Sequence, residues 1–206
     1  MFSIVTAPTA TEPTAKRSRL PVVIGIAAGV LVIVAAACTQ CVRTSDCQTA
    51  QPIELPGVPN CHKVSQYLYR GGQPTAEGMR SLKKLGIKTI VNLRTFHSDR
   101  DETGVTGLAC EHVHMQAWDG DLEDIVRFLR IATDGTRGPV FVHCQHGADR
   151  TGVACAAYRI AVQGWSKDRA IDEMVNGGYG FHSIWGNLVT FVRRLDADYL
   201  KRQLAR

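Results

Sequence analysis

The sequence lacks several features that would assign it to a common functional class. No stripe of lysine and arginine runs along it, and the net charge of +5 is carried partly by short basic groups near the two ends, so a nucleic-acid partner is not indicated. One Cys-x-x-Cys pair, at residues 38–41, does not recur, which argues against a zinc site. No internal repeat is present. We therefore predict neither a metal nor a cofactor, and a mildly basic domain suits an anionic substrate.

The length of 206 residues, with 45% hydrophobic and 21% charged residues, fits one ordinary domain plus an appendage. Composition divides the chain into four parts. Residues 1–19 are rich in Thr, Ala and Pro and are predicted to be a disordered basic segment, and residues 20–38 carry no charge. Residues 39–59 are polar with several prolines and read as a linker. Residues 60–206 form the predicted folded domain.

Residues 20–38 are long enough to span a bilayer as a helix, since roughly 20 apolar residues are needed. Lys16, Arg17 and Arg19 precede the segment, which predicts a cytoplasmic N-terminus and a domain outside the cytoplasm, in a bacterial cell envelope. A cleaved export signal is the alternative, and the segment ending in Cys38 resembles a lipoprotein signal in which Cys38 is lipidated. If the chain is exported, a disulfide among Cys41, Cys47 and Cys61 becomes plausible.

Strand and helix patterns alternate along the domain. We expect strands at residues 64–69, 87–93, 110–115 and 140–142. Helices are expected to begin after the capping residues Thr75, Asp121 and Ser166, over the apolar residues 153–162, and over a last segment that carries Leu188, Val192, Leu195 and Tyr199. This order predicts an α/β fold, with a central and mainly parallel sheet covered by helices on both faces.

The segment from His143 to Gly152, His-Cys-Gln-His-Gly-Ala-Asp-Arg-Thr-Gly, lies between the expected strand at 140–142 and an apolar helix. In a strand–loop–helix geometry the backbone N–H groups of residues 145–150 turn inward and form an anion site at the helix N-terminus. Cys144 is the candidate nucleophile, with a pKa that such a setting lowers. Arg150 is expected to grip two oxygens of a phosphate.

The other loop residues have supporting roles. Gly147 suits a position with positive φ, and Gly152 allows close packing of the helix start. Thr151 is expected to hydrogen-bond the sulfur, and His143 to hold the loop through its ring. The predicted substrate-binding residues are Gln145, His146, Gly147, Ala148 and Asp149.

With these residues in place, the chain resembles the cysteine-dependent protein tyrosine phosphatases of the compact bacterial dual-specificity type. The resemblance covers about residues 60–206 and includes Tyr-Arg-Gly-Gly-Gln-Pro at 69–74 and Val-Asn-Leu-Arg at 91–94. It implies the fold of that family and metal-independent hydrolysis of phosphomonoesters through a cysteinyl-phosphate.

The resemblance also implies an aspartate general acid on a loop before the cysteine. Asp121 is the first candidate and Asp119 the second, although Asp121 is also expected to cap a helix. Asp149, inside the loop, is a third candidate, with bracing of the loop as its preferred role. Arg94 follows a strand and is expected to brace the site.

Further residues have two possible interpretations each. His112 and His114 form either a metal-binding pair or two ordinary polar side chains. Tyr179, Phe181 and His182 line the rim of the site or pack in the core. Cys110 and Cys155 are resolving cysteines or inert thiols.

The expected substrate is a phosphorylated protein or a small phosphorylated molecule. Asp149 leaves phosphoinositides open, while Ala148, where many such enzymes carry lysine, argues against a multiply phosphorylated ring. Two classes besides phosphatases remain compatible with the loop. One is a non-catalytic phosphate-binding module, and the second is an enzyme that uses a loop cysteine for different chemistry, a rhodanese-like sulfurtransferase or an arsenate reductase.

Overall fold

The computed structural model describes residues 48–104, 106–116 and 118–206. The chain divides into two compact units, 1–43 and 44–206, and the described residues all belong to the second. The segments predicted as a basic N-terminal region and as a membrane or signal helix lie outside the described residues. Among the residues that are described, we find no helix with the length and hydrophobicity needed to cross a membrane.

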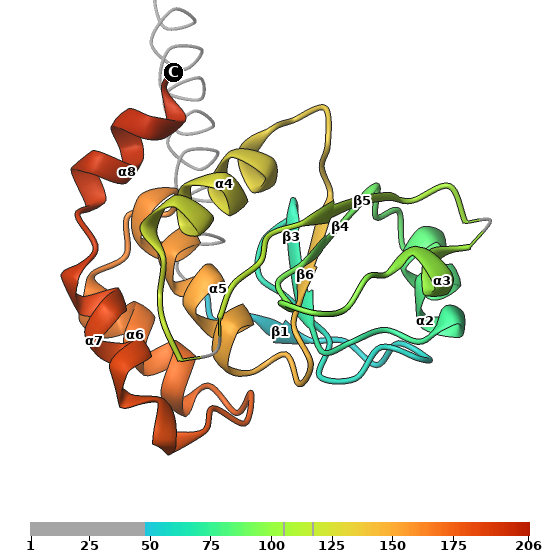
Figure 1. Ribbon diagram of the computed structural model, residues 1–206, viewed down its shortest axis with the longest axis horizontal. Coiled ribbons are helices and arrows are strands. Elements are labelled where there is room, and N and C mark those ends of the chain that lie inside the picture. The colour runs from blue at the N-terminus through green and yellow to red at the C-terminus, as the bar shows by residue number, and fades with distance from the viewer. Residues whose placement is uncertain (1–47, 105, 117) are drawn as a thin grey trace, which may run out of the picture. The chain divides into compact units, whose positions relative to one another are not determined.

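A six-stranded mixed sheet forms the centre of the domain (Figure 1). Its strands are β1 (Gln51–Pro52), β2 (His62–Lys63), β3 (Leu68–Gly71), β4 (Thr89–Asn92), β5 (Ala109–His112) and β6 (Val140–His143). Their order across the sheet is β1-β2-β3-β6-β4-β5. The four strands β3, β6, β4 and β5 are parallel, as predicted, whereas β1 and β2 add an antiparallel edge.

The inner strands are buried on both faces. Val140 and Val142 of β6 belong to one hydrophobic cluster, and Phe141 between them belongs to a second cluster on the opposite face. Ile90 and Val91 of β4 divide in the same way. Continuous apolar runs of this kind are typical of parallel strands that helices cover on both sides.

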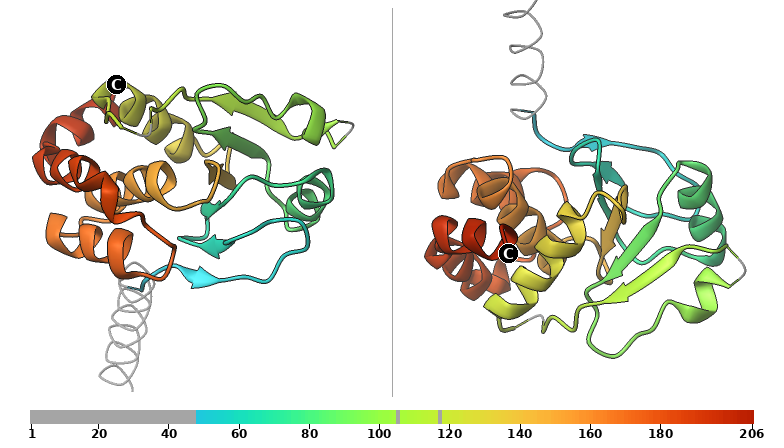
Figure 2. Two further views of the ribbon diagram at one scale, coloured as in Figure 1. Left: turned by 60° about the horizontal axis from the view of Figure 1, so that its bottom comes forward. Right: turned by 90° about the horizontal axis from the view of Figure 1, so that it is seen from above.

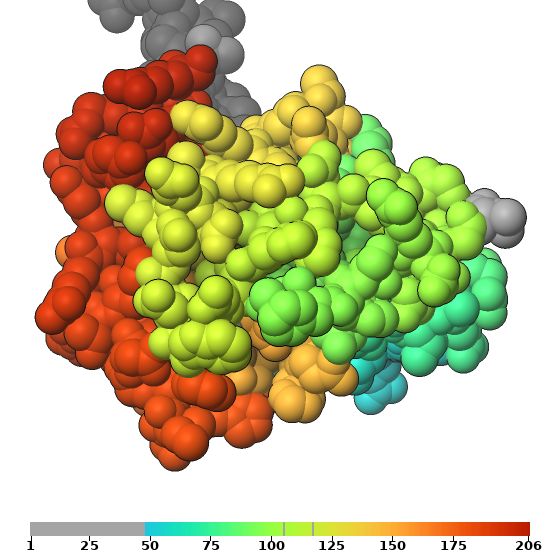
Figure 3. Space-filling view, viewed as in Figure 1, coloured from blue at the N-terminus to red at the C-terminus, as the bar shows by residue number. Residues whose placement is uncertain are grey.

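Helices cover both faces of the sheet, as Figures 1 and 2 show. They are α2 (Ala76–Lys84), α3 (Arg100–Thr103), α4 (Leu122–Thr133), α5 (Asp149–Ala161), α6 (Lys167–Asn176), the short 3₁₀ helix η1 (Ser183–Trp185), α7 (Gly186–Arg194) and α8 (Ala197–Leu204). Helix α2 packs on the smaller cluster, and α4 to α8 pack on the larger one around α5. In Figure 3, β5, the segment after it and α4 cover the middle of the visible face.

Three helices begin directly after the capping residues from which their starts were predicted. The side chain of Thr75 accepts a hydrogen bond from the Gly78 N–H, Asp121 accepts one from Glu123, and Ser166 accepts one from Arg169. Each cap satisfies an N–H group that has no partner inside its helix. The sequence signal for these starts is therefore local and needs no tertiary contact.

The N-terminal part of the domain differs from the prediction. Residues 48–59, assigned to the linker, contribute β1 and the buried Val58, so the fold begins before Asn60. The strand expected at 64–69 begins only at Leu68, because the Ser65 hydroxyl accepts the N–H groups of Tyr67 and Leu68 and closes a turn. A helix, α3, occupies part of the loop expected at 95–107.

The last predicted helix is two helices. α7 ends at Arg194 and α8 begins at Ala197. Asp196 causes the break, since its carboxylate accepts the N–H groups of Asp198 and Tyr199 and so starts a new helix. Of the predicted apolar positions, Leu188, Val192 and Leu195 are nonetheless buried, and Tyr199 is half-buried.

A buried ion pair joins α5 to α6. Arg159 and Glu173 form two hydrogen bonds of 2.6 and 2.7 Å. Glu173 also accepts the N–H of Ala50 and the hydroxyl of Tyr179, and Arg159 donates to the carbonyl of Val64. The pair therefore connects the entry of the chain into the domain with two helices of the larger layer.

Candidate active site

The candidate site lies at the carboxyl end of β6, the strand at the centre of the parallel part of the sheet. β6 ends at His143, residues 144–148 form a loop, and α5 begins at Asp149. The crevice outside the carboxyl ends of parallel strands is where α/β folds bind their ligands. Arg94 follows the neighbouring strand β4, and Gln73 follows β3, so both reach the same crevice.

Every backbone carbonyl of the loop from Cys144 to Ala148 is held by a hydrogen bond. Three donors, on Asn60, Arg70 and Gln73, come from other parts of the domain. The other two belong to the residues His143 and Gly152 that flank the loop. The bonds are His143 Nδ1 with Cys144 O (3.2 Å), Gln73 N to Gln145 O (3.1 Å), Asn60 Nδ2 to His146 O (3.1 Å), Arg70 Nη2 to Gly147 O (2.7 Å) and Gly152 N to Ala148 O (2.7 Å).

This arrangement decides where the amides of the loop point. Because a trans peptide unit is planar, the N–H of each following residue points away from the carbonyl. Within the described residues, none of the N–H groups from Gln145 to Arg150 donates to a backbone carbonyl. They remain available to an anion at the N-terminus of the thirteen-residue helix α5, where the dipole also favours negative charge. These are the N–H groups that the sequence analysis assigns to an anion site, and their role in binding an anion stays a prediction.

Two residues that support the loop were not predicted. Arg70 is fully buried, and its guanidinium lies 3.7 Å from the centroid of the Tyr179 ring while it donates to Gly147. Asn60 adopts a positive φ of 54° and donates to the carbonyls of both His146 and Tyr179. The sequence signal for Arg70 was its place directly before the Gly-Gly-Gln-Pro turn.

The predicted roles of the two glycines are confirmed. Gly147 has φ 74°, and a Cβ there would lie 2.4 Å from the carbonyl carbon of Gly71. At Gly152 a Cβ would lie 2.8 Å from Cγ of Met174, where α5 packs on α6. The first glycine allows the loop to approach β3, and the second allows two helices to approach each other.

Cys144 lies at the floor of the loop with 2% of its surface exposed, and Arg150 is half-buried above the start of α5. Burial and the nearby charge of Arg150 lower the pKa of the Arg94 guanidinium, so the two arginine charges lie near each other. The hydroxyl of Thr151 is buried and has no hydrogen-bond partner among the described residues. The bond to the sulfur expected for Thr151 is therefore not formed in this structure.

His143 and Asp99 form a buried pair beneath the loop. Nε2 of His143 lies 2.8 Å from Oδ2 of Asp99, while Nδ1 faces the Cys144 carbonyl. Both ring nitrogens thus face oxygen atoms that can accept hydrogen bonds. Burial alone would raise the pKa of Asp99, but hydrogen bonds from His143 and Gln73 and the histidine charges hold it below its usual value. Asp99 was not predicted, because it sits in a polar stretch interpreted as loop.

Asp149 joins the start of α5 to His182. It is buried, and its carboxylate accepts the backbone N–H of His182 at 2.9 Å and faces Nδ1 of the same residue at 2.9 and 3.1 Å. His182 is exposed at the rim. Of its two predicted neighbours, Tyr179 is buried under Arg70 and Phe181 packs against the larger core cluster.

The predicted acid candidates lie on a loop that docks on α7. The carbonyl of Trp118 accepts a hydrogen bond from Asn187, and Gly120 packs against the ring of Phe191. Asp121 is exposed and accepts the N–H of Glu123 as the cap of α4, and Asp119 is exposed beside it. Among the described residues, neither carboxylate forms a hydrogen bond to the loop at 143–152.

His112 and His114 do not form a metal site in this structure. Their rings lie 3.8 Å apart, and Nε2 of His112 is hydrogen-bonded to the carbonyl of Arg94. Neither belongs to a cluster of three potential ligands in the part of the chain that is described. Arg94 itself donates to Gln73 at 3.0 Å, in agreement with its predicted bracing role.

The other described cysteines differ from Cys144 in their surroundings. Cys61, Cys110 and Cys155 are free thiols. Burial raises the pKa of Cys61 to about 11 and also raises the pKa of Cys110 and Cys155. A raised pKa reduces the thiolate fraction, which makes these residues poor nucleophiles. Cys41 and Cys47, candidates for a disulfide with Cys61, lie outside the described residues.

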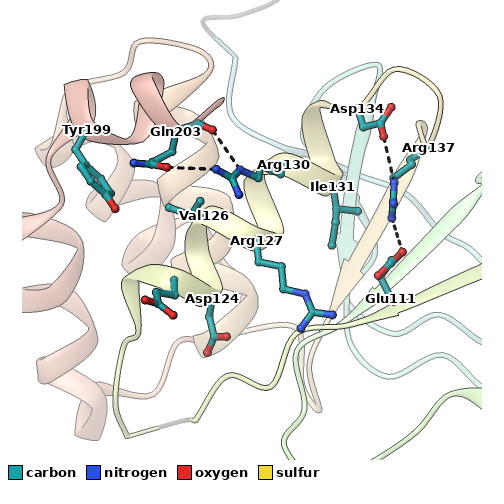
Figure 4. Close-up of a pocket in the computed structure, with 11 residues that line it drawn as sticks. Glu111, Asp124, Val126, Arg127, Arg130, Ile131, Asp134, Arg137, Tyr199 and Gln203 are labelled. Carbon is teal, nitrogen blue, oxygen red and sulfur yellow. Dashed lines mark hydrogen bonds and ion pairs between the residues drawn. The ribbon is translucent and has the colours of Figure 1, made fainter. Parts of the chain in front are cut away.

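A separate hollow of about 710 Å³ lies between β5, α4 and α8 (Figure 4). None of the residues that line it belongs to the loop at 143–152. Arg137 pairs with the carboxylates of Asp134 and Glu111, and Arg130 donates hydrogen bonds to the neutral Gln203. The hollow is distinct from the site around Cys144.

The loop combines a buried thiol, two nearby arginines and N–H groups that donate to no backbone carbonyl of the described residues, and this combination is suited to a phosphoryl group. Such geometry is that of enzymes that transfer phosphoryl groups to cysteine. A family model described as "DSP-PTPase phosphatase fused to NAD+ Kinase" matches residues 58–184. The chain belongs to this family of cysteine-dependent dual-specificity phosphatases.

Individual relatives agree with this assignment. Over 151 residues the chain is 34% identical to the dual specificity protein phosphatase TpbA of Pseudomonas aeruginosa, covering 71% of this chain and 67% of TpbA. The crystal structure of TpbA superposes with a TM-score of 0.69 over 77% of this chain and 97% of that one, at 34% identity. The catalytic core of the PP-IP phosphatase Siw14 of S. cerevisiae, 22% identical, shares the fold with a TM-score of 0.66 over 74% and 94% of the two chains.

Gly147→Ala tests the close approach of the loop to β3. The added methyl meets backbone atoms of Gly71 and Gly72 and occupies a positive φ, so we expect a loss of about 1–3 kcal/mol from backbone strain, a further loss from the clash, and at least a tenfold fall in kcat/KM. Gly86→Ala is the matched control, since Gly86 has φ 94° and nothing within 4 Å of the added methyl. Urea denaturation and hydrolysis of para-nitrophenyl phosphate measure both effects; equal losses in the two variants would contradict the clash.

Asp99→Asn tests the buried pair with His143. The pKa of Asp99 is lower in the folded protein than its ordinary value of 3.8, so its carboxylate stabilises the fold above that pH and the stabilisation is lost as pH falls through the folded pKa. We expect the variant to be less stable than the wild type at pH 6, with a difference that shrinks below pH 3.8. Urea denaturation at several pH values measures this, and a difference that does not depend on pH would contradict it.

Proposed function

We propose that this phosphatase hydrolyses phosphotyrosine, and with it phosphoserine or phosphothreonine, in a phosphorylated protein substrate, with Cys144 as nucleophile. The observation that carries the proposal is the outward anchoring of all five carbonyls from Cys144 to Ala148. The inward amides and Arg150 bind the three equatorial oxygens of the phosphoryl group and stabilise their charge in the transition state. His146 and the backbone of Gln145 to Asp149 form the substrate-binding surface.

In the first step the Cys144 thiolate attacks phosphorus. A P–S bond forms, the bond from phosphorus to the ester oxygen breaks, and the general acid gives its proton to the departing oxygen. In the second step water attacks the phosphorus, and the same carboxylate takes a proton from it. The P–S bond then breaks, which releases inorganic phosphate and regenerates the thiolate.

The buried hydroxyl of Thr151 supports a role in the second step. A buried hydroxyl without a partner is costly. We propose that the Thr151 hydroxyl donates a hydrogen bond to the Cys144 sulfur when the thiolate leaves phosphorus. The hydroxyl then gains an acceptor, and the leaving sulfur anion is stabilised.

Asp121 is the proposed general acid, with Asp119 as the alternative. Both are on the exposed segment before α4. For Asp121 to donate a proton, its carboxyl must give up the N–H of Glu123 that it accepts as a helix cap. Asp119 has no such capping bond to give up. A rearrangement of the loop on α7 would bring either residue to the crevice.

The substrate class is supported by the relatives. A variant of TpbA with serine in place of cysteine has been crystallised with phosphotyrosine, and it is 33% identical to this chain over 77% of its length, with a TM-score of 0.68. Siw14 is described as a PP-IP phosphatase, and an Arabidopsis thaliana relative, 25% identical over 128 residues, as an inositol diphosphatase. A substrate panel should therefore include inositol pyrophosphates beside phosphopeptides.

We further propose that residues 20–38 anchor the domain to a membrane, with the domain outside the cytoplasm. The uncharged run and the basic residues before it support this. Lipidation at Cys38 after signal cleavage is the alternative form of anchoring.

Cys144→Ser tests the covalent route. Replacing the sulfur leaves the loop in place but removes the nucleophile, so we expect hydrolysis of para-nitrophenyl phosphate to fall by at least a thousandfold. Cys155→Ser is the control, because Cys155 is a buried thiol with a raised pKa, and it should retain activity. Activity that survives in Cys144→Ser would contradict the mechanism.

Asp121→Asn and Asp119→Asn distinguish the two acids. Loss of the proton donor should lower kcat for a phosphotyrosine peptide about 10²–10⁴-fold and have a smaller effect on substrates whose leaving group needs no proton. Asp121→Ser keeps a helix-capping side chain and so separates capping from catalysis. Full activity in Asp121→Ser, with a loss in Asp119→Asn, would assign the acid to Asp119.

Protease accessibility tests the membrane proposal. In intact cells or spheroplasts that express the full chain, an added protease should digest a C-terminal tag and leave a cytoplasmic marker intact. Fractionation should place the protein with membranes. A tag that becomes sensitive only after lysis would contradict the proposed orientation.

A further inference from the structure

Three potential metal ligands meet at the rim of the site. They are His146 in the loop, Asp149 at the start of α5 and His182 just before η1. One ligand atom from each lies within 4.8 Å of the other two. The rings of His146 and His182 have centroids 5.5 Å apart, and both residues are exposed, whereas Asp149 is buried.

The donor set is that of a transition-metal site. Two imidazoles and one carboxylate are the protein ligands of several zinc centres that keep a further position for water. In this chain Asp149 already holds both the backbone N–H and the ring of His182. Two of the three ligands are thus oriented before any ion binds, which reduces the entropy that binding costs.

The contact between Asp149 and His182 marks the position that an ion can take. Nδ1 of His182 faces both carboxylate oxygens of Asp149 at 2.9 and 3.1 Å. A ligand atom of His146 lies within 4.8 Å of both, so a divalent ion can bind all three residues. The exposure of both histidines gives the ion a path from solvent and leaves its remaining positions to water.

A second cluster, His97, Asp99 and Glu102, is less suited to an ion. It offers one imidazole, and Asp99 is already bonded to His143 and Gln73. His97 and Glu102 pair with each other at 3.0 Å. Of the two groups of potential metal ligands, the one formed by His146, Asp149 and His182 is therefore better suited to bind an ion.

We propose that His146, Asp149 and His182 bind a divalent transition-metal ion of the zinc class, and that the ion competes with the phosphorylated substrate. The competition rests on the proposed function, in which His146 contacts the substrate, whereas the binding itself does not. Bound metal takes the ring of His146 away from the substrate and occupies the rim two residues from Cys144. Metal then raises KM for the substrate, and a chelator restores it.

Binding is tested on the full chain with Co²⁺ as a spectroscopic probe for Zn²⁺. A site of two histidines and one aspartate gives the weak visible bands of Co²⁺ without the intense near-ultraviolet absorption of thiolate ligation. Titration of the full-length Cys144→Ser variant should show one such binding event. Zn²⁺ should displace the Co²⁺ and abolish the bands.

Substitution assigns the ligands. His182→Ala and His146→Ala should each weaken the binding at least tenfold, and His114→Ala, another exposed histidine, should leave it unchanged. Both ligand substitutions are at exposed positions, and circular dichroism checks that each variant is folded. Asp149→Asn removes the third ligand in the same assay.

The outcomes separate binding from regulation. Co²⁺ binding that is unchanged in His182→Ala and His146→Ala, or that disappears in Cys144→Ser, would overturn the site. If the three ligand substitutions weaken Co²⁺ binding but added Zn²⁺ does not raise KM, the metal site stands and only the competition with substrate is overturned. Because the spectra need no turnover, an inactive protein would still reveal whether the site exists.

Discussion

The structure depends on the outward anchoring of five consecutive carbonyl groups. The loop from Cys144 to Ala148 has no regular secondary structure of its own, and in solution its peptide units would turn freely. Asn60, Arg70, Gln73 and the two loop ends fix each unit in one orientation. The cost of ordering the amides is met when the domain folds, so that no reorganisation is needed when the phosphate arrives.

The same anchoring explains why so much polar chemistry lies inside the domain. Arg70, His143 and Asp99 are buried, and buried charged groups are costly unless they are paired or hydrogen-bonded. Here each holds another group of the site: Arg70 holds Gly147 and stacks on Tyr179, and Asp99 orients His143 beneath Cys144.

The sequence predicted the parts of the site that are contiguous in the chain. Cys144, Arg150 and the two glycines are readable because strand, loop and helix follow one another within about twenty residues, and helix caps such as Thr75 and Ser166 depend on a single side chain. Asn60, Arg70 and Asp99 were missed, since their roles arise from contacts 44 to 86 residues apart. The break between α7 and α8 was missed because apolar spacing continues through Asp196.

The buried pair of Arg159 and Glu173 also determines how the domain would respond to a mechanical load. Glu173 accepts the amide of Ala50, close to where the described chain begins, and it meets the hydroxyl of Tyr179. The Tyr179 ring in turn stacks on the guanidinium of Arg70, which donates a hydrogen bond to the Gly147 carbonyl. A tension applied to the chain before Ala50 would therefore pass to the phosphate-binding loop through three side chains in series, those of Glu173, Tyr179 and Arg70.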